Sequence, residues 1–312
     1  MVRQVATAGV PGEAAAGAGT RLDLGAHTFD LTHRALVMGI LNRTPDSFYD
    51  RGATYELDAL LGRAERVVAE GADLLDVGGV KAGPGPDVTE AEELDRVVPA
   101  VAALARRFDV PISVDTWRAS VARECYSAGA VLGNDISGFA DPGYLPAAAA
   151  AGAAVVATHI RLAPRVRDPD PRYRDVVATV AAFLVERADR AARAGIPAGR
   201  IVLDAGLDLG KTAEQSLTLL RASDELARLG HPLLLSASNK TFLGSLFGLD
   251  LQDRREASLA AAALGIARGC RVVRVHDVAG TCRVRDAMEA VLREVPPTSR
   301  RRSDRADVTA PE

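Results

Sequence analysis

The chain has 312 residues, 48% of them hydrophobic and 25% charged, which suits one large buried core in a globular enzyme. A net charge of -3 argues against nucleic acid as a partner, because nucleic-acid binding usually needs a basic face. Three cysteines without a CxxC spacing provide neither a disulfide framework nor a zinc site, and no apolar run approaches the roughly 20 residues that span a bilayer. The N-terminus lacks a secretory pattern, so we expect a cytoplasmic protein without a membrane partner.

The two ends of the chain differ from its middle. Residues 1–20 contain a Gly- and Ala-rich aperiodic stretch, and we expect a disordered leader there. Residues 21–31 alternate around Gly25-Ala26, which predicts a short β-hairpin. Residues 295–312 contain Pro-Pro and three consecutive arginines, and we expect a disordered basic tail. Residues 21–294 are then a single domain.

One pattern repeats between these ends. A short apolar run leads to Gly, Asp, Asn or His, and an amphipathic helix follows. Continuous apolar runs of this length are typical of parallel strands that are buried on both faces. The predicted strands are 35–40, 73–77, 111–114, 130–133, 153–157, 201–203, 232–235 and 271–275.

The intervening segments carry helical signals. From Leu57 to Val68, apolar residues fall at helical spacing, and Thr89 with Glu92 predicts a capping box at the start of the next helix. Residues 173–195 and 212–229 each read as one helix. Eight such units in roughly 250 residues match the size of a closed (β/α)8 TIM barrel. An open doubly wound sheet would need a Gly-rich dinucleotide motif after its first strand, which the segment 39–42 (GILN) does not provide.

Every predicted strand ends near a polar residue. In barrel enzymes the functional groups come from these carboxyl ends, so we expect a shared site there, although any single Asp or Asn could instead cap a helix. The residues are Asn42, Asp76, Asp115, Asn134-Asp135, His159, Asp204, the group Ser236, Ser238, Asn239 and Lys240, and the group Arg274, His276 and Asp277.

Lysine usage gives a second indication. Among 38 basic residues only Lys81, Lys211 and Lys240 are lysines, and all three follow predicted strands. A compact ammonium has uses that a planar guanidinium does not, so these positions are candidates for the site. Arg274 and His276 alternate along one strand, which points both side chains to the same face as a candidate anion site.

Five motifs in order resemble the dihydropteroate synthase family. They cover most of the predicted folded domain. They are 38–48 (MGILNRTPDSF), 76–79 (DVGG), 112–116 (ISVDT), 134–136 (NDI) and 274–278 (RVHDV). The resemblance implies a pterin-binding barrel that joins 6-hydroxymethyl-7,8-dihydropterin pyrophosphate to 4-aminobenzoate and expels pyrophosphate with the help of Mg2+. It also implies a homodimer, for which the Ala-rich stretch 257–267 is a candidate contact.

The resemblance assigns roles to matching positions. Asp115, Asn134 and Asp204 would bind the pterin ring, Lys240 would reach its carbonyl or N5, and Asp115 would stabilise a cation at the 6-methylene. The pyrophosphate would be held by Arg274, His276 and Mg2+. The full set is Asp115, Lys240 and Asp204 as catalytic residues, Asn134, Asp76, Arg274, His276, Ser238 and Lys81 as substrate-binding residues, and Asn42 as a metal ligand.

The sequence departs from the family chiefly near the second substrate. The loop that usually reads Gly-Gly-Glu-Ser-Thr-Arg-Pro-Gly is GGVKAGPG at 78–85, so Ala82 and Gly83 replace Thr and Arg. Ser-Arg-Lys becomes SNK at 238–240, Asp-Pro-Gly becomes DAG at 204–206, and Met-His-Met becomes THI at 158–160. The pattern indicates a divergent paralogue that keeps its pterin-facing residues.

Three alternatives stay open beside the family reaction. The protein could use another amine or nucleophile in a pocket shaped by Lys81, Asn239 and Arg43. It could be a pterin-binding homologue with lost turnover, in a binding or regulatory role. It could also be a pterin-dependent methyltransferase of the related corrinoid class, against which the retained Arg274 and His276 argue.

Overall fold

The computed structural model describes residues 18–43 and 56–293. The expected leader at 1–20 and tail at 295–312 lie outside these ranges, except for residues 18–20, which form the 3-10 turn η2 (Ala18–Thr20). The motif at 38–48 is described only as far as Arg43.

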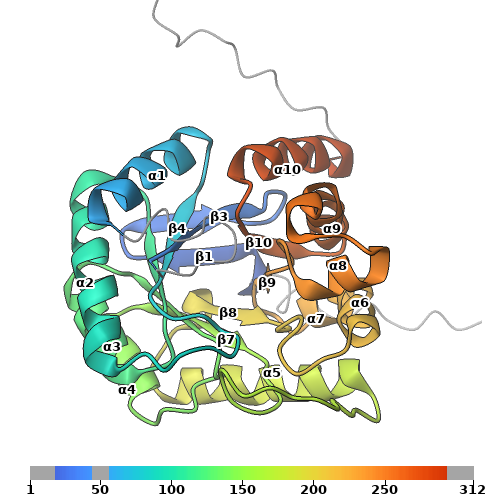
Figure 1. Ribbon diagram of the computed structural model, residues 1–312, viewed down its shortest axis with the longest axis horizontal. Coiled ribbons are helices and arrows are strands. Elements are labelled where there is room, and N and C mark those ends of the chain that lie inside the picture. The colour runs from blue at the N-terminus through green and yellow to red at the C-terminus, as the bar shows by residue number, and fades with distance from the viewer. Residues whose placement is uncertain (1–17, 44–55, 294–312) are drawn as a thin grey trace, which may run out of the picture.

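The core of the fold is a closed barrel of parallel strands in the order β10, β3, β4, β5, β6, β7, β8, β9 (Figure 1). The strands are β3 (Leu36–Asn42), β4 (Leu74–Gly78), β5 (Ile112–Asp115), β6 (Leu132–Asp135), β7 (Ala154–Thr158), β8 (Ile201–Asp204), β9 (Leu233–Leu235) and β10 (Cys270–Val275). The (β/α)8 barrel expected from the sequence is confirmed. Several strands run one or two residues beyond the predicted apolar runs, because polar residues at their carboxyl ends still pair with the neighbouring strand.

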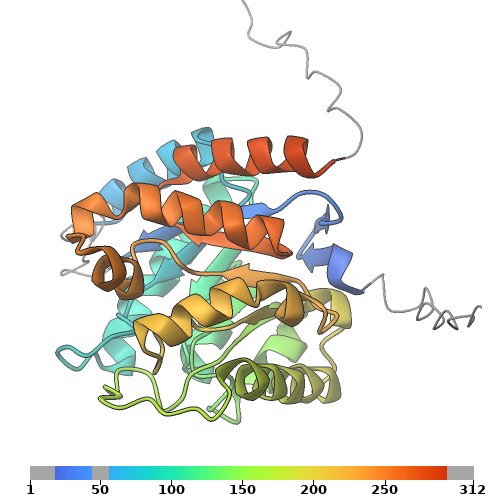
Figure 2. The same ribbon diagram turned by 90° about the vertical axis from the view of Figure 1, so that its right-hand side faces the viewer.

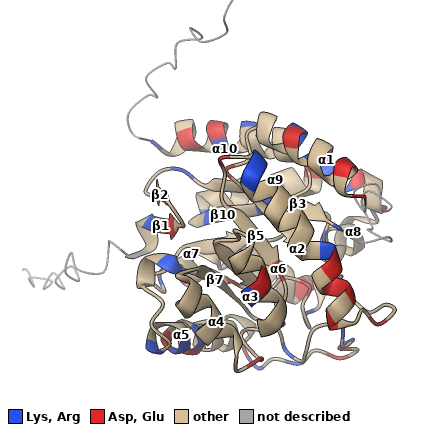
Figure 3. Cartoon of the chain, turned by 90° about the vertical axis from the view of Figure 1, so that its left-hand side faces the viewer, with Lys and Arg blue, Asp and Glu red and all other residues tan. Residues whose placement is uncertain are grey.

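Helices surround the barrel on the outside (Figure 1). They are α1 (Leu57–Ala69), α2 (Glu90–Arg107), α3 (Ala119–Ser127), α4 (Tyr144–Ala151), α5 (Val176–Arg193), α6 (Ala213–Arg221), α7 (Ser223–Ala227), α8 (Thr241–Phe247), α9 (Arg255–Ala267) and α10 (Val278–Leu292), with the 3-10 turns η3 (Ala198–Arg200) and η4 (Leu251–Asp253). Lys/Arg and Asp/Glu side chains are interspersed on these helices and their loops (Figure 3). Among the helices described, none is long and apolar enough to cross a lipid bilayer.

Two local helix predictions were wrong. The expected capping box at the start of α2 is only half formed: Thr89 accepts the N–H of Glu92 at 3.2 Å, but the Glu92 carboxylate pairs with Arg96 one turn further on. The span 212–229 is two helices, α6 and α7, because the chain leaves helical geometry at Ala222 (φ -90°, ψ 14°). The complete capping box lies at Thr212 and Gln215.

The predicted N-terminal hairpin is present and packs into the barrel. Strands β1 (Arg21–Leu24) and β2 (His27–Asp30) pair antiparallel, and Gly25 turns the chain with φ at 60°, a conformation that costs glycine little. Leu22, Leu24 and Leu31 are 0–1% exposed. They form one apolar cluster with barrel residues that include Leu36, Met38, Leu74, Leu132, Val156, Val202, Leu234 and Val272. Figure 2 shows the hairpin at the end of the barrel opposite α8.

The inside of the barrel changes from apolar to polar along each strand. Side chains two residues apart on a strand point to the same side, so the interior residue above Leu74 is Asp76 and the one above Val272 is Arg274. In the same way Asn134 follows Leu132, and Asp204 follows Val202. The hairpin end of the barrel interior is therefore dry, and polar side chains occupy the carboxyl end.

We expect Leu22→Ala to lower the free energy of unfolding by about 2–5 kcal/mol, because it removes a fully buried side chain from the apolar cluster. Urea denaturation measures this change. Thr28→Ala, an exposed change in the same hairpin, is the control and should alter stability by less than about 0.5 kcal/mol. Equal effects of the two substitutions would mean that the hairpin does not contribute to the barrel core.

Candidate functional site

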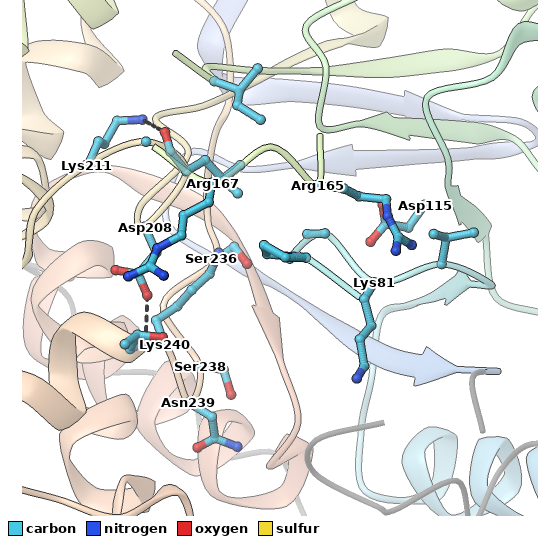
Figure 4. Close-up of a pocket in the computed structure, with 18 of the residues that line it drawn as sticks. Lys81, Asp115, Arg165, Arg167, Asp208, Lys211, Ser236, Ser238, Asn239 and Lys240 are labelled. Carbon is cyan, nitrogen blue, oxygen red and sulfur yellow. Dashed lines mark hydrogen bonds between the residues drawn. The ribbon is translucent and has the colours of Figure 1, made fainter. Parts of the chain in front are cut away.

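A cavity of about 660 Å3 opens at the carboxyl ends of the barrel strands. It is lined by the ends of β3, β5 and β10 and by loops that follow β4, β7, β8 and β9. All three lysines of the chain line it, as the sequence suggested: Lys81, Lys211 and Lys240 (Figure 4). The predicted residues Asn42, Asp115, Ser238, Arg274 and His276 also line it.

A carboxylate without solvent exposure lies at the barrel centre beneath this cavity. Asp76 is 0% exposed and accepts hydrogen bonds from Ser113 Oγ at 2.5 Å and Asn134 Nδ2 at 3.3 Å. Arg274 Nε donates to the same carboxylate at 2.6 Å. Because a buried charge is tolerated only when it is paired and hydrogen-bonded, these three partners fix Asp76 in place. The structure thus brings together the predicted residues Asp76, Asn134 and Arg274, which come from three different strands.

Arg274 also ties this network to Asp115 at the cavity wall. Its Nη2 donates to Asp115 Oδ2 at 2.7 Å, so one guanidinium bridges two carboxylates. Burial raises the pKa of Asp115 to about 7, against the lowering effect of Arg274. Burial alone would lower the pKa of Arg274, but the carboxylates of Asp76 and Asp115 raise it above its ordinary value. Burial and the neighbouring carboxylates of Asp76 and Glu93 thus oppose ionisation of Asp115, and Arg274 favours it.

A second buried group fixes the turn that follows β8. Lys211 Nζ donates to the carbonyls of Gly206 at 2.8 Å and Leu209 at 3.0 Å, and lies 2.9 Å from His159 Nδ1. Burial lowers the pKa of His159 to about 3, with Lys211 as the next cause, and burial also lowers the pKa of Lys211, to about 7. Gly206 approaches so closely that a Cβ there would lie 1.9 Å from the His159 carbonyl oxygen.

The turn braced by Lys211 holds Asp204 and Lys240. Asp204 is 6% exposed, and its Oδ1 accepts the N–H of Gly206 at 2.8 Å. Burial raises the pKa of Asp204, while the Gly206 N–H and the two nearby lysines lower it. Lys240 Nζ donates to the Leu207 carbonyl at 3.0 Å, which places its ammonium over the same turn. Lys211 is therefore a positioning residue for both predicted catalytic groups.

The loop after β9 forms the adjacent wall of the cavity. Ser238 Oγ lies 3.0 Å from His276 Nδ1, which joins two predicted substrate-binding residues. Asn239 adopts a left-handed conformation with φ at 59°, which asparagine tolerates better than most residues. Its backbone N–H donates to Ser258 at 3.0 Å and its carbonyl accepts from Arg254 at 3.1 Å. The neutral Asn239 side chain therefore stands where the family pattern has an arginine.

Some of the polar strand-end residues have a structural role. Asp135 accepts the N–H groups of Ser137 at 2.6 Å and Phe139 at 2.9 Å, and Asp277 caps α10 through the N–H of Gly280 at 2.8 Å. His159 does not line the cavity, because its ring packs edge-on against Phe183. Helix capping therefore accounts for Asp277, as the sequence allowed, whereas Asp135 fixes the turn that follows β6.

Sequence reasoning missed several site residues. Ser113 lies two residues before Asp115 on β5, so strand alternation alone would have placed it inside the barrel. Arg165, Arg167 and Arg254 line the cavity from loops whose paths no sequence pattern predicts. Asp208 lines it too, and accepts the N–H groups of the first two residues of α8.

The donor groups at the mouth fit a metal ion that arrives with a phosphate-bearing substrate. Within residues 18–43 and 56–293, no group of three His, Cys, Asp or Glu side chains is arranged to hold a metal ion. Asn42 Oδ1 and Asp115 Oδ2 flank Gly78, at 3.6 Å and 3.7 Å from the position a Cβ there would take. Mg2+ commonly takes few protein oxygens and completes its shell with substrate phosphates and water.

Comparison with known proteins identifies the family. A family model described as pterin binding enzyme matches residues 38–276. The "Inactive dihydropteroate synthase 2" of Mycobacterium leprae is 46% identical over 271 residues, covering 85% of this chain and 93% of that protein. The dihydropteroate synthase of Synechocystis is 42% identical over 275 residues, covering 86% and 94%. The structure of the Xanthomonas albilineans dihydropteroate synthase with 4-aminobenzoic acid has a TM-score of 0.82 at 39% identity, covering 89% of this chain and 100% of that one.

The closed barrel, its buried network of Asp76, Asn134, Asp115 and Arg274, and the match to the family model together define a barrel of the pterin-binding class. Within that class the chain belongs to the dihydropteroate synthase family, as a divergent paralogue. Its likeness extends both to a relative named as a synthase and to one named as inactive.

We expect Arg274→Gln to raise the pKa of Asp115 above about 7, because the guanidinium is the main group that lowers it. A carbon-13 NMR titration of labelled aspartate carboxyls measures the shift. Arg228→Gln, an exposed change on the helical surface, is the control. An unchanged Asp115 titration in Arg274→Gln would contradict the ion pair.

We expect Lys211→Met to cost about 1–3 kcal/mol of stability, because it leaves buried carbonyls without their donor. The pKa of His159 should rise in this variant, since Lys211 contributes to lowering it. Chemical denaturation and a histidine NMR titration measure the two effects, with Lys211→Arg as the variant that keeps the charge. A stable variant with an unchanged His159 titration would show that the ammonium does not brace the turn.

Proposed function

We propose that the protein joins 6-hydroxymethyl-7,8-dihydropterin pyrophosphate to an aryl amine, with 4-aminobenzoate as the reference acceptor, in folate biosynthesis. The observation that carries this proposal is the preserved polar floor: Asp76, Asn134, Asp115 and Arg274 form one hydrogen-bonded network beneath the cavity. In the reaction the amine nitrogen forms a bond to the 6-methylene carbon. The carbon–oxygen bond to the diphosphate breaks, pyrophosphate leaves with the electron pair, and the amine loses a proton to water.

The chemistry of the floor matches a pterin ring. The ring edge carries an amino group and N–H donors, for which buried carboxylates are suitable acceptors. Asp204 and Asp115 supply carboxylates, and Asn134 offers an amide that can donate and accept. Lys240 lies over the turn after Asp204, where its ammonium would meet the ring carbonyl or N5. Asp115 would stabilise positive charge that develops at the 6-methylene.

The diphosphate would sit on the β10 and β3 side of the mouth. His276 and Asn42 line that side, and Arg274 of the floor lies on β10, two residues before His276. Mg2+ would neutralise the leaving diphosphate when it is bound with the substrate, with Asn42 as one oxygen ligand. Ser238 holds the His276 ring at 3.0 Å and so orients it toward this region.

A second candidate function is pterin binding without turnover. Two positions favour it, since Ala82 and Gly83 remove a hydroxyl and a cation from the loop after β4, and a relative at 46% identity is named as inactive. Loss of one charge-assisted contact corresponds to roughly tenfold or more in affinity or rate.

We further expect a cytoplasmic homodimer. The exposed apolar residues Val291 and Leu292 on α10 and Leu264 on α9 support an interface on that face.

We expect the purified protein to release pyrophosphate from the dihydropterin substrate with Mg2+, and to do so only when 4-aminobenzoate is present. Asp115→Asn and Lys240→Ala should each reduce kcat by about a hundredfold or more, because they remove charges placed at the reacting centre. Asp109→Asn, a change of a fully exposed carboxylate, is the control and should act like wild type. Pterin binding without release for any amine would favour the second candidate, and no pterin binding would overturn both.

A further inference from the structure

The cavity has an excess of positive charge. Seven Lys and Arg side chains line it, against three carboxylates, Asp115, Asp168 and Asp208. Each carboxylate already has a partner: Asp115 pairs with Arg274, Asp168 with Arg161 at 2.5 Å, and Asp208 accepts the N–H groups at the start of α8. The acidic groups are therefore engaged, and within the described ranges Arg165, Arg167 and Arg254 line the cavity without an ion pair to a carboxylate.

Two of these cations stand on the loop after β7, away from the predicted diphosphate residues. In the closed barrel order, β7 is four strands from β3 in either direction, so it lies directly across the barrel from Asn42. His276 follows β10, the strand next to β3. Arg165 and Arg167 start from this far side, but Figure 4 shows their side chains pointing in different directions, Arg165 toward the loop after β4 and Arg167 toward Asp208.

Arg165 is held in place by neutral groups only. Its Nη2 donates to the carbonyls of Gly85 at 2.6 Å and Pro86 at 2.5 Å, and its N–H donates to the Ala82 carbonyl at 3.0 Å. These bonds join the loop after β7 to the loop after β4, the one that lost the family's own arginine. Its backbone has φ at 67°, a conformation that is costly for a residue with a side chain. The strained loop after β7 thus places the positive charge of Arg165 against the loop after β4.

Arg167 and two apolar residues of the same loop, Leu162 and Val166, line the cavity together. Arg167 is exposed, lines the cavity, and makes no hydrogen bond or ion pair with the residues described (Figure 4). Leu162 and Val166, 48% and 55% exposed, line the cavity from the same loop. Apolar side chains beside guanidinium groups suit a flat aromatic ring that carries carboxylates.

We propose that the acceptor site of this protein takes an aryl amine with two carboxylates in place of the single carboxylate of 4-aminobenzoate. This inference rests on the proposed function and specifies its second substrate. The second carboxylate pairs with Arg167, and the ring packs on Leu162 and Val166. The change agrees with the altered loops, since the loop after β9 has Asn239 in place of the family's arginine, the loop after β4 has its cation at Lys81 and not at Gly83, and Arg167 stands on the loop after β7.

A charge series of acceptors tests the proposal. We would measure kcat/KM for pyrophosphate release with 4-aminobenzamide, 4-aminobenzoate and 4-aminophthalate, which differ by one carboxylate at each step. We expect 4-aminophthalate to exceed 4-aminobenzoate by about tenfold or more, the effect of one additional charge-assisted contact.

Two arginine variants on the same loop locate the effect. In Arg167→Gln the ratio of the kcat/KM values for 4-aminophthalate and 4-aminobenzoate should fall to near unity. In Arg172→Gln the ratio should stay as in wild type, because Arg172 is paired with Asp170, is 82% exposed and does not line the cavity. No preference in the wild type, or a preference that survives Arg167→Gln, would overturn the proposal. An equal fall for all acceptors in Arg167→Gln would also overturn it, and would assign Arg167 to the diphosphate.

Failure of the proposed function gives a different result. If no amine supports release, equilibrium dialysis of 4-aminophthalate and 4-aminobenzoate decides the matter, with protein that holds 6-hydroxymethyl-7,8-dihydropterin and inorganic pyrophosphate. A tighter dissociation constant for 4-aminophthalate by about tenfold, lost in Arg167→Gln, supports the dianionic site without turnover. Equal dissociation constants overturn it.

Discussion

The site depends on the ion pair between Arg274 and the fully buried Asp76. A lone carboxylate inside the barrel would be expelled or protonated, and a lone guanidinium at the same place would be equally costly. Together, with Ser113 and Asn134 as additional donors, they form a rigid polar floor on top of the apolar layer. Because Arg274 also reaches Asp115, the carboxyl at the cavity wall takes its position from this floor, while burial raises its pKa and Arg274 opposes that rise. The family resemblance assigns Arg274 to the pyrophosphate. In this structure the partners of Arg274 are the carboxylates of Asp76 and Asp115.

Much of this architecture could be predicted from the sequence. The eight apolar runs predicted the strands, because parallel strands that are buried on both faces need a continuous run of apolar residues. The five motifs pointed to Asp76, Asp115, Asn134 and Arg274. Strand alternation was sufficient to find Ser113 but was not applied to it. Other features could not be read from residue patterns. The break at Ala222 depends on packing between helices, and the contribution of Arg165 and Arg167 depends on where a loop with φ at 67° carries them.

The departures from the family gather around the second substrate. The residues of the floor match the family motifs, whereas the loops after β4 and β9 have Ala82 in place of a threonine and Gly83 and Asn239 in place of arginines. The loop after β7 reaches across to the loop after β4 through Arg165, so two segments that are distant in sequence form one wall. Divergence is therefore confined to parts of the barrel that can vary without disturbing the buried ion pair.

The hairpin that fills the amino end of the barrel affects how molecules reach the cavity. With Leu22, Leu24 and Leu31 packed into the apolar layer, the described part of the barrel is closed at its amino end, and the cavity opens at the strand carboxyl ends. Two molecules that bind in this cavity therefore share one opening, and the deeper one lies against the buried polar side chains while the other lies against the loops.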